Sequence, residues 1–104
     1  MTTEIINRIR DALRIVIDPE LGQNIVDLGF VYDITIVGPA ARITMTTTSP
    51  GCPASSFLLE GARHAAEGVE GVSSVDVEMT FDPPWTPSRI DPSVSTSLGF
   101  ATIN

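Results

Sequence analysis

The chain has 104 residues, of which 42% are hydrophobic and 18% charged, so we expect a single folded domain spanning 1–104 rather than a disordered chain. Its 13 acidic residues outnumber its 6 basic ones, and the net charge of −7 argues against partners such as nucleic acid or anionic membrane. No apolar run reaches the ~18 residues of a membrane span, and one cysteine cannot form an internal disulfide, which together predict a soluble cytoplasmic protein.

The first element is predicted to be a helix. Ile6, Ile9 and Leu13 recur at helical spacing after a threonine cap, and Pro19 ends the helix near residue 16 or 17. The next segment, DPELGQNIVDLG (18–29), contains proline, glycine and several apolar anchors. This composition predicts an ordered loop.

Two segments of alternating polarity follow the loop. Residues 30–37 (FVYDITIV) and 42–48 (RITMTTT) are joined by GPAA, which predicts a β-hairpin. The predicted inward positions are Phe30, Tyr32, Ile34, Ile36, Ile43, Met45 and Thr47. The other face of the second strand is predicted to carry Arg42, Thr44, Thr46 and Thr48.

A second helix is predicted from Pro53 to about Glu67, with Phe57 and Leu58 on its buried side. Residues 72–81 form a third predicted strand, the proline-rich segment DPPWTP (82–87) is irregular, and 92–98 is expected to form a short last helix. The order α-β-β-α-β predicts the α+β class, a two-layer sandwich with helices on one face of a small sheet. The strand order stays open.

The only cysteine, Cys52, lies in TSPGCPAS (48–55), directly before the second predicted helix. A helix start favours negative charge and lowers the pKa of a thiol, which predicts a functional thiolate with Thr48 and Ser49 as supporting hydroxyls. The alternative is a small buried side chain. His64 lies twelve residues further along the same helix, roughly 18 Å away, which excludes a Cys–His dyad within one chain.

Two further features have two interpretations each. Asp18 and Glu20 flank Pro19 and are candidate oxygen ligands beside the thiol, together with Asp27, but the same residues suit an Asx-type helix stop with a solvated glutamate. Trp85 stands between prolines, where it either closes the edge of the core or presents a rigid docking surface to a client protein.

Three segments, DPELGQNIVDLGFVY, TSPGCP and DPPWTP, occur in an order and spacing that resemble the family of small metal–sulfur cluster assembly proteins, including SufT-like and PaaD-like proteins. The resemblance implies an α+β domain and an accessory role in maturing iron–sulfur proteins. The acidic loop of the family maps onto Asp18 and Glu20, and its cysteine onto Cys52. Its hydroxyl pair, typically Thr-Thr, maps onto Thr48 and Ser49, so this chain departs from the pattern at the second position.

The leading hypothesis is an accessory protein rather than an enzyme, in which Cys52 transiently binds iron or an iron–sulfur cluster. Its partners would be the assembly machinery and client apoproteins, and a homodimer would let two chains each supply one thiolate. One alternative is an interaction module that docks clients without binding metal. Another is a thiol-dependent small-molecule enzyme in which Glu20 acts as the base.

Overall fold

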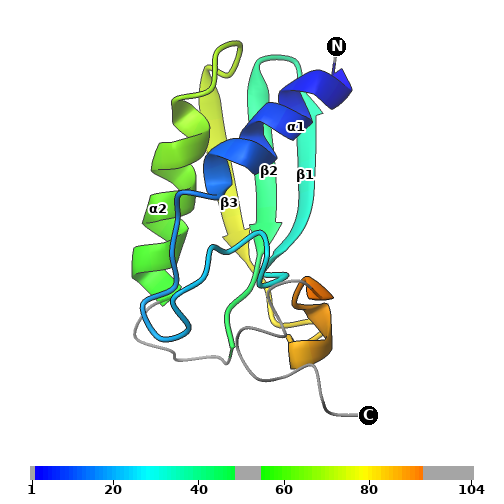
Figure 1. The fold of residues 1–104 in the computed structure, drawn as a ribbon. Coiled ribbons are helices and arrows are strands. Elements are labelled where there is room, and N and C mark those ends of the chain that lie inside the picture. The colour runs from blue at the N-terminus through cyan, green and yellow to red at the C-terminus, as the bar shows by residue number, and fades with distance from the viewer. Residues whose placement is uncertain (1, 49–54, 93–104) are drawn as a thin grey trace.

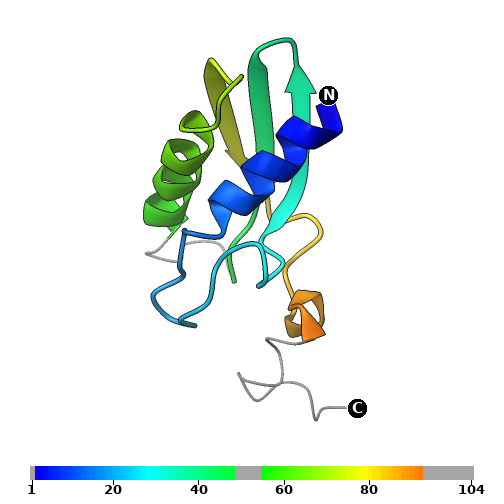
Figure 2. The same cartoon turned by 45° about the horizontal axis from the view of Figure 1, so that its top comes forward.

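The computed structural model describes residues 2–48 and 55–92, and its elements follow the predicted order (Figure 1). They are α1 (Thr2–Leu13), β1 (Val31–Val37), β2 (Ala40–Met45), α2 (Ser55–Glu67), β3 (Ser74–Met79) and a 3-10 helix, η1 (Pro87–Arg89). Both helices lie across the same face of the sheet (Figures 1 and 2). The predicted two-layer α+β sandwich is therefore confirmed. No helix in the described part of the chain is long and apolar enough to cross a membrane.

The three strands form one mixed sheet in the order β1-β2-β3. β1 and β2 are the antiparallel hairpin expected from the sequence, whereas β2 and β3 run parallel and are connected through α2. Ile34, Ile43 and Val77 are paired across the sheet, and they pack into the hydrophobic core. Their polar neighbours alternate onto the opposite, open face, where Arg42 forms an exposed ion pair with Asp76.

The core lies between the helices and the sheet. α2 contributes Leu58, Ala62 and Ala66, which recur every four residues, and α1 contributes Ile9 and Leu13. Burying a side chain the size of leucine stabilises the fold by roughly 1.5–3 kcal/mol. The small side chains of α2 leave room for the elements that pack against it.

The ends of several elements differ from the prediction. α1 ends at Leu13 rather than at residue 16 or 17, because the backbone of Val16 and Asp18 pairs instead with the returning loop at Ile25 and Gln23. The second strand begins at Ala40 and ends at Met45, and the third is shorter than 72–81. Pro53 and residues 93–98 of the predicted last helix lie outside the described residues.

The prediction that Phe57 is buried was wrong. Phe57 is 62% exposed, because the buried stripe of α2 runs through Leu58, Ala62 and Ala66, and Phe57 lies beside that stripe. The error follows from assigning two adjacent residues to one helix face: successive residues differ by about 100° around a helix.

Candidate functional site

The carboxyl end of β2, the start of α2 and the loop between α1 and β1 lie together at the lower end of the molecule in Figure 1. Thr46 and Thr47 follow β2 and are 0% and 1% exposed. The backbone N–H of Thr46 donates to the carbonyl of Phe30 at 2.8 Å, and the Thr47 hydroxyl lies 3.1 Å from the hydroxyl of Ser55. The hydroxyl pair of Thr47 and Ser55 therefore connects the strand end to the helix start, and Thr48 comes next, half-buried.

Thr46 was predicted to face outward, and this prediction was wrong. The strand pairing ends at Met45, so the alternation of inward and outward positions no longer applies to the residues that follow. Thr47 was not selected as a site residue from the sequence. The signal that points to it is the run of three threonines directly before Ser49 and Pro50.

Asp18 is 1% exposed and organises the acidic loop. Its Oδ1 accepts hydrogen bonds from the backbone N–H groups of Glu20 at 2.7 Å and Leu21 at 2.9 Å. Its own N–H donates to the Gln23 carbonyl at 2.9 Å, and its carbonyl accepts from Gly22. A buried carboxylate is tolerated when it is hydrogen-bonded in this way. The loop is thus the Asx-type turn that the sequence allowed, with the Glu20 side chain exposed.

The segment that leads into the acidic loop lies beside α2. A groove of about 430 Å³ is lined by Ile15, Val16, Ile17, Phe57, Gly61, His64 and Ala65. Ile17 directly precedes Asp18, and Phe57 is the third residue of α2, so the chain just before Asp18 shares this groove with the helix. Cys52 precedes the same helix in the sequence. His64 is exposed on the groove wall.

Asp27, the third acidic candidate, is engaged within its own loop. One carboxylate oxygen pairs with the Arg14 guanidinium at 2.6 Å, and the other accepts from the Asn24 side-chain amide at 3.0 Å. The amide oxygen of Asn24 in turn accepts from the backbone of Val26 and Asp27. Asp27 therefore stabilises the path of the loop.

Cys52 and Ser49 lie outside the described residues. Within the ranges 2–48 and 55–92, no group of three histidine, aspartate or glutamate side chains is arranged to hold a metal ion.

Trp85 packs over the end of the core. Its ring meets Phe30 edge-to-face at 5.4 Å between centroids, and its Nε1–H donates to the Leu28 carbonyl at 2.6 Å. Ile90 is buried nearby, and the N–H of Asp91 donates to the Asp27 carbonyl at 2.7 Å. These contacts hold residues 82–91 against the loop before β1. A docking role for Trp85 stays a prediction.

The fold, together with the sequence segments DPELGQNIVDLGFVY, TSPGCP and DPPWTP, defines a small α+β domain of the cluster-assembly class. The chain belongs to the iron–sulfur cluster assembly protein family, whose family model matches residues 6–79. It is 38% identical to an Fe-S protein maturation auxiliary factor of Porphyromonas gingivalis over 85% of each chain, and 37% identical to the auxiliary factor YitW of Bacillus subtilis over 88% of this chain and 90% of that one.

Solved structures share the fold. A domain of unknown function, DUF59, from Bacillus anthracis superimposes with a TM-score of 0.89 at 36% identity and covers 94% of both chains. A conserved hypothetical protein from Thermotoga maritima gives a TM-score of 0.77 at 45% identity and covers 89% of this chain and 92% of that one. The likeness therefore extends well beyond the residues that the family model matches.

Proposed function

We propose that this chain is an accessory factor that helps to mature iron–sulfur proteins, without itself being an enzyme. The observation that carries the proposal is the family match over residues 6–79, together with two relatives named as Fe-S protein maturation auxiliary factors at 37–38% identity. Other relatives at 35% and 34% identity are named iron–sulfur cluster carrier proteins. Iron or a cluster is then the cargo, and the assembly machinery and client apoproteins are the partners.

Cys52 is the residue assigned to contact that cargo. Its place in the sequence before α2 favours a thiolate, because a helix start presents unpaired N–H groups and a positive dipole. Thr48 and Ser49 would supply hydroxyl donors to sulfur, and Asp18 and Glu20 would assist from the acidic loop. A single thiolate gives weak, reversible binding, which suits transfer of a cluster better than storage. A second chain would supply another thiolate in a cluster-bridged homodimer.

The test is the activity of an iron–sulfur enzyme such as aconitase in cells with and without this chain. Its specific activity, measured per amount of enzyme protein, should fall several-fold in cells that lack the chain and return when the chain is expressed. The amount of the enzyme protein serves as the control, because a maturation factor acts on loading rather than on synthesis. Equal specific activity in both cells would contradict the proposed function.

Asp18→Asn separates the structural role of this side chain from a role toward the cargo. The amide oxygen can still accept the two backbone hydrogen bonds, so we expect a loss of only about 1–2 kcal/mol in the free energy of unfolding. Client maturation should nevertheless fall several-fold, because the negative charge is gone. Chemical denaturation and the aconitase assay measure the two effects.

Two variants complete that experiment. Asp18→Ala removes the acceptor itself and should lower the free energy of unfolding by about 2–4 kcal/mol, since it leaves two part-buried backbone N–H groups without their acceptor. Asp33→Asn removes one charge at an exposed position of β1 and should leave maturation unchanged. Full maturation with Asp18→Asn would restrict Asp18 to its role in the turn.

A further inference from the structure

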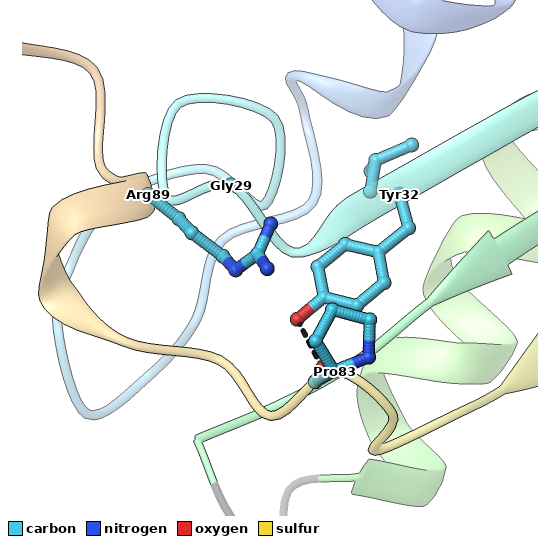
Figure 3. Close-up of a pocket in the computed structure, with 5 residues that line it drawn as sticks. Gly29, Tyr32, Pro83 and Arg89 are labelled. Atoms are coloured by element: carbon cyan, nitrogen blue, oxygen red, sulfur yellow. Dashed lines mark hydrogen bonds between the residues drawn. The ribbon is translucent and has the colours of Figure 1, made fainter.

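A second pocket lies between the start of β1 and the segment that follows β3 (Figure 3). It has a volume of about 450 Å³ and is lined by Gly29, Val31, Tyr32, Pro83 and Arg89. Gly29, Val31 and Tyr32 come from the first of the three sequence motifs and Pro83 from the third, and the proposed function gives these residues no role. We propose that this pocket binds a carboxylate carried on an apolar body.

The Arg89 guanidinium is the group that would bind the carboxylate. It lies over the Tyr32 ring, 4.7 Å from the ring centroid. In the described part of the chain no carboxylate forms an ion pair with Arg89, although the chain has 13 acidic residues. The arginines that do form ion pairs there are Arg8, Arg14, Arg42 and Arg63. The donor fork of Arg89 is therefore not engaged by an acidic side chain of the described residues.

The pocket is held in shape before any ligand arrives. The Tyr32 hydroxyl donates to the Pro83 carbonyl at 2.8 Å, which fixes the ring on which the guanidinium rests (Figure 3). The backbone of Arg89 lies directly against Gly29: a Cβ on Gly29 would come within 2.3 Å of the Arg89 carbonyl oxygen. A preformed pocket loses less conformational entropy on binding, which raises affinity.

The lining favours a carboxylate over a phosphate. Arg89 is the only cation among the described residues that line the pocket, and its planar fork matches the two oxygens of a carboxylate. A phosphate carries about two negative charges at neutral pH, so a chain of net charge −7 repels it more strongly. Val31, Tyr32 and Pro83 present apolar surface to the remainder of the ligand. The carboxylate is either a free organic acid or a glutamate side chain of a protein.

Titration of ¹⁵N-labelled protein with benzoate, followed by NMR, tests the proposal. We expect saturable shifts at Tyr32 and Arg89 with a dissociation constant of about 1–10 mM, as suits one exposed charge pair with a small apolar contact. Benzamide, which has the same ring without the charge, should bind at least about tenfold more weakly. The peptide acetyl-Ala-Glu-Ala-amide distinguishes the source: tighter binding of benzoate assigns a free acid, and tighter binding of the peptide assigns a side chain.

Variants locate the bound group. Arg89→Gln should weaken benzoate binding by about tenfold or more, and Arg89→Lys should fall between Gln and the natural residue because it keeps the charge without the planar fork. Arg10→Gln, on α1, is the matched control and should bind as the natural chain does. Equal binding of benzoate and benzamide, or unchanged binding by Arg89→Gln, would overturn the proposal. The benzamide comparison uses the natural chain and so does not depend on how any variant folds.

Discussion

Replacing Cys52 by alanine is expected to reduce client maturation to the level of cells that lack the chain, a loss of more than about tenfold. Alanine neither ionises nor binds iron, so the side chain proposed to contact the cargo is lost. The specific activity of aconitase in cells carrying only the variant measures the loss. Anaerobic reconstitution with iron and sulfide, followed by absorption spectroscopy, shows whether the purified variant still takes up iron.

Ser56→Ala is the matched control for this substitution. Ser56 is exposed in the first turn of α2, so its loss alters the same junction without removing the thiol, and maturation should be unchanged. The melting temperature of Cys52→Ala should stay close to that of the natural chain. Normal maturation by Cys52→Ala, with no iron uptake by either protein, would sink the thiolate assignment and favour the alternative of a docking module.

The sheet shows which parts of the fold are readable from sequence. The hairpin was predictable because one face of the sheet is buried, so Ile34, Ile36 and Ile43 alternate with polar residues. The parallel pairing of β2 with β3 has no such local signal, since it depends on where α2 returns the chain. The end of α1 was misplaced for a similar reason: the backbone at residues 16–18 pairs with a loop that the helical pattern does not reveal.

The candidate site likewise has features that depend on local sequence and features that depend on long-range contacts. The turn at Asp18 was predictable because an aspartate before proline at a helix end forms local hydrogen bonds, here to residues 20 and 21. A role of Asp18 toward the cargo stays a prediction. The pocket at Arg89 was not identified. Tyr32 and Pro83, which bond across it, are 51 residues apart, and no pattern within either segment indicates the other. Long-range contacts of this kind require the folded chain.

Replacing Gly29 by alanine is expected to lower the free energy of unfolding by about 3 kcal/mol or more, from two additive effects. The backbone φ of Gly29 is 77°, which residues with a Cβ rarely adopt. In addition, the new Cβ would lie 2.3 Å from the Arg89 carbonyl oxygen and 2.7 Å from the Arg89 Cβ, so η1 would have to move. The melting temperature should fall by about 4–8 °C for each kcal/mol lost in a domain of this size.

Gly22→Ala separates the two effects. Gly22 lies in the same loop with a φ of 71°, but a Cβ there would meet nothing within 4 Å, so only the backbone strain of about 1 kcal/mol should remain. The difference between the two variants' losses in free energy of unfolding is then the cost of moving η1 and Arg89 away from the loop. Because Gly29 lies against Arg89, Gly29→Ala should also weaken benzoate binding, whereas Gly22→Ala should not. Equal destabilisation by the two substitutions would show that a Cβ at position 29 does not displace Arg89, and would contradict this prediction.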